Sequence, residues 1–543
     1  MQNINIGDKY ELYIDNMAHE GQGVGRLDGI AVFVRGALKG ERVLAKIDEK
    51  HKNYLNAHVE KILLPSQERI TPKCIYAGKC GGCTLQHLSY KGQLEFKKQV
   101  VDDSLSRIGK INTIVYDTIG MDNPLYYRDK AEYPVGIEDG NIKSGFYASK
   151  SHNIIAIDSC MIQSDYSIEA MKTVREWANN YKISIFDEKS GKGLLRHIIT
   201  KVGFTTKEVM VILVINGIDI PYKDELINTL KKNIKELKSI VLNINKSRSR
   251  LVMGSQNIVI YGDGYITDYI GDKKFEISPL SFFQVNPIQT KVLYEKALEY
   301  ADLKGDEIVI DVYCGIGTIS IFFAKYVKHV YGIEVVSDAV EDAKRNAAIN
   351  NVDNADFIAG KAEDVMKDLC NKGLKPNVIV FDPPRKGLDK DVVETSIKMN
   401  PKKIIYVSCN PTTLARDLRI FEDNGYKTEK VQPVDMFPYT YHVETCVLLS
   451  HKSADDFISV KMEYEDRKIQ PDRVTYRLIQ EYVKEKYGFK MHTAYIAEVK
   501  RSLGLPMYVA PNAVEKLKHP YKPAPEYKVE AIKDALRHFK VID

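Results

Sequence analysis

The stretch that decides the fold joins a short apolar run to a glycine turn: Ile308-Val309-Ile310-Asp311-Val312-Tyr313-Cys314-Gly315-Ile316-Gly317-Thr318. The run reads as a β-strand, and the glycines allow a ligand to approach the backbone before the next helix begins. A pyrophosphate-binding loop would carry a third glycine at a fixed spacing, and this turn lacks it. The stretch therefore predicts a site for a cofactor smaller than a dinucleotide.

Acidic residues follow this turn in an informative order. The next apolar strand ends at Glu334, twenty-three residues after Asp311, where a carboxylate can accept both hydroxyl groups of a ribose. A third strand leads into the acidic loop 360–364, which would flank an adenine. A glycine turn, a ribose carboxylate and an acidic loop in this order are typical of enzymes that use S-adenosylmethionine.

Between about residues 280 and 450, apolar strands alternate with helical patterns, which predicts a parallel sheet covered by helices on both faces. Two strand ends and a later segment carry reactive groups: Asp382 precedes Pro383-Pro384-Arg385, Cys409 follows the apolar run 404–407, and Glu444 lies thirty-five residues after Cys409. Their convergence at one sheet edge would allow covalent chemistry, with Cys409 as a nucleophile rather than a core residue.

A cysteine cluster lies nearer the N-terminus. Cys74, Cys80 and Cys83 have the spacing Cys-x5-Cys-x2-Cys, and Gly81-Gly82 would let the backbone bend around one centre. Zinc and iron–sulfur clusters both accept four thiolates, and Cys160 is the nearest remaining cysteine. The uneven triplet favours a [4Fe-4S] cluster over zinc, which is usually held by two Cys-x2-Cys pairs.

The chain should hold four parts. Residues 1–64 alternate in short runs between glycines, which predicts a small barrel that either binds nucleic acid or only supports its neighbour. Residues 65–278 form a mixed domain with the cysteine set, and residues 279–451 form the cofactor domain. Residues 467–543 carry 16 Lys/Arg against 9 Asp/Glu and read as helices around a Pro-rich link. This extension could contact nucleic acid or be a basic docking appendage.

Composition limits the class of protein. The 543 residues are 44% hydrophobic and 28% charged, and no run of ~18 apolar residues occurs that could cross a membrane. The first residues lack the basic and apolar regions of a signal peptide, so a cytoplasmic location is expected. Eight cysteines in that reducing compartment favour metal binding or catalysis over disulfides. No feature predicts an obligate protein partner.

Together these motifs resemble one family, the bacterial RNA 5-methyluridine methyltransferases, and especially the iron–sulfur-containing 23S ribosomal RNA (uracil-5-)-methyltransferases, over roughly residues 5–450. The resemblance rests on the barrel, the four cysteines, and the motifs 282–286 (FFQVN), 311–317, 382–385 (DPPR), 408–411 (SCNP) and 442–445 (HVET). It implies a class I S-adenosylmethionine-dependent methyltransferase (Rossmann-like) α/β domain beside an N-terminal barrel, a central iron–sulfur α+β domain and a small helical extension.

The resemblance also implies roles for single residues. The cofactor contacts would be Gln284, Tyr313, Glu334 and Asp382. Cys409 would add to C6 of a uracil so that C5 can accept a methyl group, and Glu444 would then remove the C5 proton. The implied enzyme, of class EC 2.1.1, modifies a uridine of 23S ribosomal RNA. Two alternatives stay open: a transfer RNA target, or a non-catalytic iron–sulfur RNA-binding protein.

Overall fold

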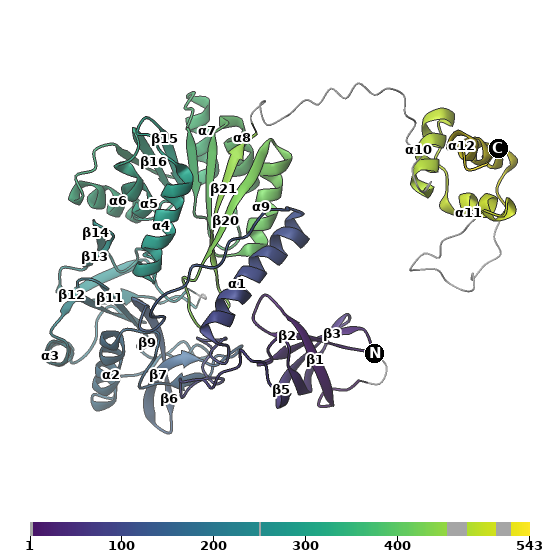
Figure 1. The fold of residues 1–543 in the computed structure, drawn as a ribbon. Helices are drawn as coiled ribbons and strands as arrows, with labels where there is room; N and C mark the ends of the chain where they lie inside the picture. The colour runs from purple at the N-terminus through teal and green to yellow at the C-terminus, as the bar shows by residue number, and fades with distance from the viewer. Residues whose placement is uncertain (1–3, 249–250, 453–474, 506–522, 543) are drawn as a thin grey trace. The chain divides into compact units, whose positions relative to one another are not determined.

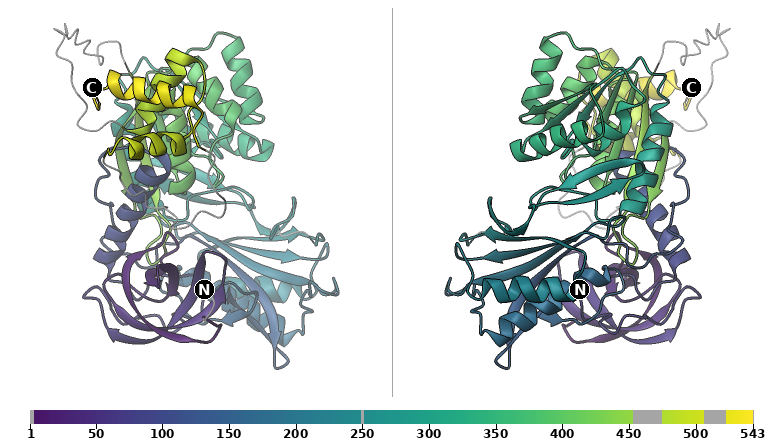
Figure 2. Two further views of the ribbon diagram at one scale, coloured as in Figure 1. Left: turned by 90° about the vertical axis from the view of Figure 1, so that its right-hand side faces the viewer. Right: turned by 90° about the vertical axis from the view of Figure 1, so that its left-hand side faces the viewer.

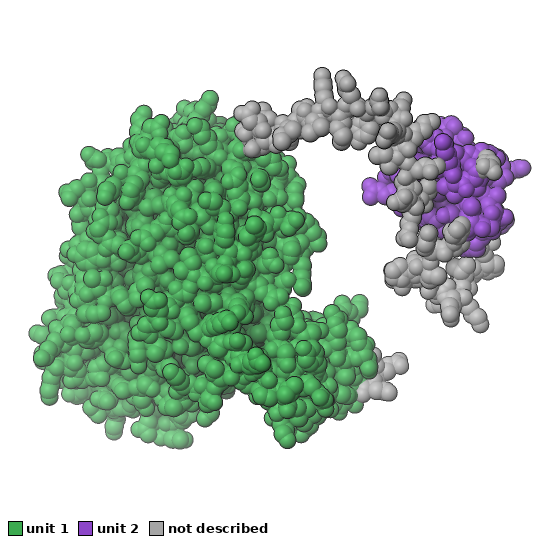
Figure 3. Space-filling model, in the orientation of Figure 1, with its two compact units in different colours: residues 1–456 green, residues 457–543 purple. Residues whose placement is uncertain are grey.

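The structure, a computed structural model, describes residues 4–248, 251–452, 475–505 and 523–542. The chain divides into two compact units, residues 1–456 and 457–543 (Figure 3). The first eight residues of the predicted extension, 467–474, and Pro506, Pro511 and Pro520 of the Pro-rich link lie outside the described residues.

The first unit begins with a closed five-stranded barrel, in the strand order β1-β2-β3-β5-β4 (Figure 1). The strands are β1 (Lys9–Met17), β2 (Gly23–Leu27), β3 (Ile30–Arg35), β4 (Arg42–Lys50) and β5 (Tyr54–Leu64). Alternate apolar residues such as Ile14, Val32 and Val34 are fully buried, as expected for strands with one face on a core. Gly23 is needed for this packing, because a Cβ there would lie 2.8 Å from side-chain atoms of Ile14 and Ala37.

The barrel leads through the cysteine segment to helix α1 (Tyr90–Ser104) and then to a mixed seven-stranded sheet, in the order β12-β11-β10-β9-β6-β7-β8. Its strands are β6 (Lys130–Glu138), β7 (Asn141–Tyr147), β8 (Ile154–Ala156), β9 (Leu195–Val202), β10 (Val209–Ile215), β11 (Leu237–Ile244) and β12 (Gln256–Gly262). Helices α2 (Asp165–Asn180) and α3 (Lys223–Asn233) cover one face of it, and the hairpin β13 (Ile266–Ile270) and β14 (Lys273–Ile277) follows.

The cofactor sheet has the order β17-β16-β15-β18-β19-β21-β20. Its strands are β15 (Ile308–Val312), β16 (His329–Glu334), β17 (Ala355–Ala359), β18 (Val378–Phe381), β19 (Lys403–Ser408), β20 (Tyr426–Val434) and β21 (Glu444–His451). Six strands run in one direction, and β21 runs antiparallel to both neighbours. The expectation of a wholly parallel sheet is therefore wrong for β21, which is connected to β20 by a loop instead of a helix.

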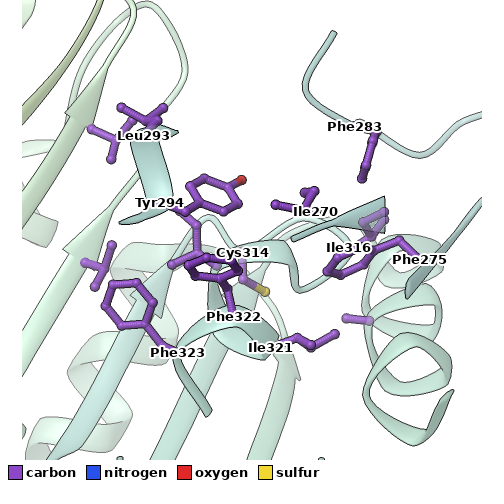
Figure 4. Packing of buried hydrophobic residues seen from close by; sticks show 14 of the residues in the cluster. Ile270, Phe275, Phe283, Leu293, Tyr294, Cys314, Ile316, Ile321, Phe322 and Phe323 are labelled. Carbon is purple, nitrogen blue, oxygen red and sulfur yellow. The ribbon is translucent and has the colours of Figure 1, made fainter. Parts of the chain in front are cut away.

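Helices cover both faces of this sheet, as predicted (Figures 1 and 2). They are α4 (Pro287–Ala301), α5 (Thr318–Ala324), α6 (Ser337–Ile349), α7 (Ala362–Asn371), α8 (Lys390–Met399) and α9 (Pro411–Asp423). Residues of α4, α5 and α6 share one core with Ile199, Met210 and Ile212 of the middle sheet. Figure 4 shows part of this core, with Tyr294, Cys314 and Phe322 side by side. The two sheets therefore share a continuous core, which holds them in one arrangement.

The second unit contains three described helices, α10 (Tyr476–Tyr487), α11 (Thr493–Ser502) and α12 (Glu526–His538). They correspond to the helices predicted from the sequence, and their apolar faces pack on one another through Ile479, Val483, Ile496 and Ile532. Gly488 ends α10 with φ +76°, a conformation that glycine adopts without strain. Across the described ranges of both units, no helix combines the length and the apolar character that crossing a membrane requires.

Candidate active site

The reversed strand β21 brings Glu444 beside Cys409. Ser408, the last residue of β19, is paired with Thr445 in the antiparallel ladder. The residues next to this pair, Cys409 just after β19 and Glu444 at the start of β21, therefore lie at the same end of the sheet. Cys409 is half-buried and Glu444 is buried, at 3% exposure. Cys409 then leads directly into α9, whose N-cap is Asn410 and whose first residue is Pro411. Thiol and carboxyl thus lie together at the carboxyl ends of the parallel strands.

The neighbouring strand β18 brings Asp382 and Arg385 to the same place. Gln284 donates a hydrogen bond of 3.5 Å from Nε2 to Asp382 Oδ2. The carbonyl of Arg385 accepts hydrogen bonds from Asn410 Nδ2 at 3.0 Å and from Thr413 Oγ1 at 3.3 Å. The Asp382-to-Arg385 loop is therefore tied to the start of α9, next to Cys409.

These charges lie close enough to shift one another's pKa values. Burial, helped by the carboxylates of Glu444 and Asp382, raises the pKa of Cys409 to about 12, although the guanidinium of Arg385 acts in the opposite direction. Burial also raises the pKa of Glu444 well above its usual range, again opposed by Arg385. In the free protein both shifts favour the protonated forms of these groups. Positive charge brought to this site would favour their reactive, ionised forms.

Helix α1 positions the loop between β20 and Glu444. The ammonium of Lys97 pairs with the carboxylate of Asp435, and both side chains are fully buried. Lys97 Nζ also donates to the carbonyl of Phe437 at 3.0 Å, and Tyr90 donates through its hydroxyl to Asp435 Oδ2 at 2.8 Å. Breaking a buried pair of this kind leaves an uncompensated charge, so the loop is strongly held.

The predicted cofactor turn has a left-handed backbone at three positions and open space at Gly315. Tyr313, Gly315 and Gly317 have φ values of +73°, +54° and +81°, and a Cβ on Gly315 would meet no atom within 4 Å. The amide of Gly315 donates to Glu334 Oε2 at 3.1 Å, which joins the turn to the end of β16. A small cavity of about 30 Å³ is lined by Gln284, Tyr313 and Asp382, among others.

Asp311 carries a further sign of a missing partner. Its Oδ2 accepts a 2.6 Å hydrogen bond from Ser320, whereas its Oδ1 is buried without a hydrogen-bond partner. An open turn, a free acceptor and a carboxylate at the end of β16 together fit S-adenosylmethionine, which would bind over the turn with its ribose toward Glu334. Cys314, by contrast, is buried at 5% exposure in the core and is no nucleophile.

Asp311→Asn should stabilise the protein more at pH 8 than at pH 5. Burial raises the pKa of Asp311 to about 7. A carboxyl with a raised pKa adds stability below its ordinary pKa of about 4, and that stability is lost as the pH rises through about 7. The amide does not titrate, so its advantage over the carboxyl should grow by about 3 kcal/mol between the two pH values. Thermal unfolding of both proteins at each pH measures this.

Asp417→Asn is the matched control. Asp417 is equally buried but accepts hydrogen bonds from Tyr406 Oη at 2.7 Å and from the Leu388 amide at 2.9 Å. Its replacement should lower the melting temperature at both pH values. A stability advantage of Asp311→Asn that does not change with pH would contradict the account of Asp311.

The four predicted metal ligands line one larger cavity, of about 450 Å³: Cys74, Cys80, Cys83 and Cys160. Burial raises the pKa of Cys83 to about 12, and the thiols of Cys160, Cys80 and Cys74 add to the effect, so the four lie near one another. Within the described ranges, no group of three or more His, Cys, Asp or Glu side chains is placed to hold a metal ion.

Several features of the site were not evident from the sequence. Arg385 is the cation that opposes the raised pKa of Cys409, and only its place after Asp382-Pro383-Pro384 pointed to it. The Lys97–Asp435 pair joins residues 338 positions apart and left no local signal. His442 lies against Tyr441, with ring centroids 4.2 Å apart, and burial lowers its pKa to about 4, so it is a neutral packing residue.

Comparison with known proteins shows the family of the chain. The model of the TRAM domain matches residues 5–59, and that of the tRNA (uracil-5-)-methyltransferase family matches residues 89–452, more than half of the chain. A protein of Caldanaerobacter subterraneus subsp. tengcongensis described as an uncharacterized RNA methyltransferase is 59% identical over 450 residues, which are 83% of this chain and 99% of the relative. A second such protein, from Clostridium tetani, is 51% identical over 81% of this chain and 96% of its own length.

Among solved structures, the fold is similar to that of the Pyrococcus abyssi tRNA (uracil-54, C5)-methyltransferase in complex with S-adenosyl-L-homocysteine. The TM-score is 0.65 at 29% sequence identity, and the match covers 81% of this chain and 100% of that one. The predicted class I methyltransferase fold with an N-terminal small barrel is thereby confirmed. The chain belongs to the tRNA (uracil-5-)-methyltransferase family and is an S-adenosylmethionine-dependent RNA (uracil-5-)-methyltransferase.

Proposed function

We propose that the protein methylates C5 of a specific uridine in 23S ribosomal RNA, with Cys409 as the nucleophile and Glu444 as the general base. The observation that supports these roles is the pairing of Ser408 with Thr445, because it sets a thiol and a carboxyl side by side at the edge of the cofactor sheet. The cofactor turn and Asp382 lie at the same edge. The contacts proposed for S-adenosylmethionine are Gln284, Tyr313, Glu334 and Asp382.

The chemistry follows from what these side chains can do. C5 of uracil is a weak nucleophile, and addition of the Cys409 thiolate to C6 forms a Cys409 Sγ–C6 bond and makes C5 electron-rich. S-adenosylmethionine, when bound, supplies a positively charged sulfonium with a transferable methyl group. Glu444 then removes the C5 proton, and the electron pair of the C5–H bond restores the C5–C6 double bond while Cys409 leaves. A base stacked in a helix cannot reach Cys409, so the uridine must be flipped out or lie in a loop.

Transfer RNA is the second candidate substrate. The named family and the Pyrococcus abyssi enzyme both refer to transfer RNA. The match to that enzyme covers 81% of this chain, so it extends beyond residues 89–452, the part matched by the family model. The overall architecture therefore does not distinguish a transfer RNA target from a ribosomal RNA target. The resemblance to the iron–sulfur enzymes, carried by the four cysteines, favours ribosomal RNA.

One experiment separates these substrates. The full-length protein is incubated with labelled S-adenosylmethionine and either unmodified 23S ribosomal RNA or unmodified transfer RNA, and 5-methyluridine is mapped. We expect product at a defined uridine of 23S RNA only. Product only on transfer RNA would replace the proposed target, and no product on either RNA would favour a non-catalytic RNA-binding protein.

We also propose that Cys74, Cys80, Cys83 and Cys160 hold a [4Fe-4S] cluster. Four thiols around one cavity are the donor set of such a cluster. The Cys80 sulfur accepts the amide of Gly82 at 3.4 Å, and the amides of Ile162 and Gln163 lower the otherwise raised pKa of Cys160. Hydrogen bonds of this kind stabilise cluster thiolates. A cubane spreads its ligands around four irons, whereas zinc needs them gathered around one ion.

Protein purified without oxygen should contain about four iron and four sulfide per chain. Cys83→Ser should lose most of both, because Cys83 would be a ligand. Cys370→Ser is the control, since Cys370 is half-buried on α7, away from the cysteine cavity, and should leave the metal content unchanged. About one zinc per chain with no sulfide would contradict the cluster.

A further inference from the structure

We propose that Arg416 and Asp417, on the helix that begins beside the proposed nucleophile, are positioning residues that keep the guanidinium of Arg385 next to Cys409. This inference rests on the proposed function, because it concerns the thiolate that Cys409 needs as a nucleophile. The two residues would thereby control formation of that thiolate without touching the substrate.

The guanidinium of Arg385 is not held by contacts of its own. It is exposed, and among the described residues no hydrogen bond or ion pair involves it. Its charge nevertheless lowers the pKa of Cys409, against the carboxylates of Glu444 on β21 and Asp382 at the end of β18, which both raise it. The place of this cation therefore depends on how the backbone of its loop is held.

One face of α9 binds that backbone. Arg416 donates from Nη2 to the carbonyl of Lys386 at 3.1 Å and to that of Leu388 at 3.4 Å. Asp417 Oδ2 accepts a hydrogen bond of 2.9 Å from the amide of Leu388. The two side chains also bind each other, with 2.8 Å between Arg416 Nε and Asp417 Oδ1. Two consecutive residues of α9 thus bind three main-chain groups of the loop just after Arg385.

The loop fits closely against this pair. The Gly387 amide donates to the carbonyl of Pro384 at 2.9 Å, which closes a turn around the two residues between them. Gly387 has φ +77°, and a Cβ there would lie 2.6 Å from both Arg416 Nη2 and Asp417 Oδ2. The turn therefore has room for glycine only, and it cannot shift toward α9 without displacing the charged pair.

Asp417 also joins the loop to the strand that ends at the nucleophile. The oxygen that accepts the Leu388 amide, Oδ2, accepts a 2.7 Å hydrogen bond from Tyr406 Oη on β19, three residues before Cys409. The Asp417 side chain is 1% exposed, and hydrogen bonds to a buried carboxylate are strong. One carboxylate thus fixes the strand of Cys409 and the loop of Arg385 relative to each other.

Alkylation of Cys409 tests the proposal. The full-length protein, purified without oxygen and without added RNA or cofactor, is treated with iodoacetamide at about pH 8.5, and labelling of the Cys409 peptide is followed by mass spectrometry. Only the thiolate reacts, so a higher pKa slows labelling. Arg385→Gln removes the cation and should slow labelling by about three- to tenfold.

Arg416→Gln keeps Arg385 but releases its loop, and it should slow labelling at least about threefold. Asp417→Asn should do the same. In both variants the pH profile of labelling should move to higher pH, because the thiol loses the cation that favours its ionised form. The Arg416 side chain is 48% exposed, so Arg416→Gln should fold.

The double variant Arg385→Gln/Arg416→Gln distinguishes positioning from a general loss of structure. If Arg416 acts through Arg385, the double variant should label no more slowly than Arg385→Gln, because no cation is left to position. Arg419→Gln is the matched control on the same helix, since its guanidinium contacts Glu422 and Asp423 of α9 instead of the loop. It should label at the wild-type rate.

Three results would overturn the proposal: wild-type labelling in Arg385→Gln, wild-type labelling in both Arg416→Gln and Asp417→Asn, or a double variant slowed by the product of the two single effects. The last result would show that Arg416 supports the fold independently of Arg385. Because labelling is measured without RNA and without methyl transfer, each of these results differs from a failure to form 5-methyluridine.

Discussion

Cys409→Ala is expected to abolish methyl transfer, with a loss of at least ~10⁴-fold in turnover, because removal of a nucleophile leaves only binding and positioning to catalyse the reaction. Affinity for S-adenosylmethionine should be unchanged, since Cys409 does not line the cavity at the cofactor turn. Turnover is measured from labelled methyl groups in RNA, and cofactor affinity by calorimetry.

Cys370→Ala is the control for this substitution. Cys370 is a half-buried cysteine like Cys409, but it lies on α7 and outside the proposed active site. Its replacement should leave turnover within about twofold of the wild type. A Cys409→Ala protein that methylates RNA at the normal rate would contradict the covalent mechanism.

Glu444→Gln is expected to trap the protein on its RNA. Glutamine fills the same buried volume but cannot accept the C5 proton, so the Cys409 Sγ–C6 bond should persist after the methyl group has been transferred. Turnover should fall by about 10²- to 10⁴-fold. A protein–RNA adduct that survives denaturing gel electrophoresis, and forms only with S-adenosylmethionine present, is the expected product.

The double variant Cys409→Ala/Glu444→Gln separates a covalent adduct from tight binding. It should form no denaturant-resistant complex, because the sulfur is gone. Glu444→Gln that turns over normally without an adduct would show that another group removes the proton. Asp382 is the nearest alternative, since its carboxylate raises the pKa values of both Cys409 and Glu444.

The pKa values of the site give these predictions a physical basis. Three acidic groups, Asp382, Cys409 and Glu444, lie together in a desolvated site. Burial raises the pKa of Cys409 and of Glu444, Asp382 adds to both shifts, and Glu444 adds to the shift of Cys409. Arg385 is the only described cation among the causes of the shifts at Cys409 and Glu444, and it does not overcome burial. These shifts thus favour the protonated thiol and carboxyl until positive charge enters the site.

Sequence patterns predicted much of the fold because they are local. Apolar runs of four to six residues marked β15, β16, β18 and β19. The turn at 313–317 was recognised because glycines often occupy backbone conformations that other residues avoid. The structure has positive φ values at Gly315 and Gly317. The closed barrel was likewise predicted from short alternating runs between glycines.

The direction of β21 could not be predicted from local sequence patterns. Its apolar residues predict a strand, but nothing in them says that it runs against β19 or that it lies between β19 and β20. A wholly parallel sheet would place the start of β21, and Glu444 with it, at the opposite edge from Cys409. The reversed strand is thus what makes the thiol and the carboxyl neighbours.

By itself, the sequence determined the fold class, and it predicted the cofactor turn and the reactive side chains, since each depends on residue type and short spacing. Only the tertiary structure decided that Glu444 lies beside Cys409 and that Arg385 is the cation next to them. It likewise decided that Lys97 on α1 holds the loop before Glu444. These facts depend on strand order and direction and on contacts between distant segments, which are set by packing of the shared core.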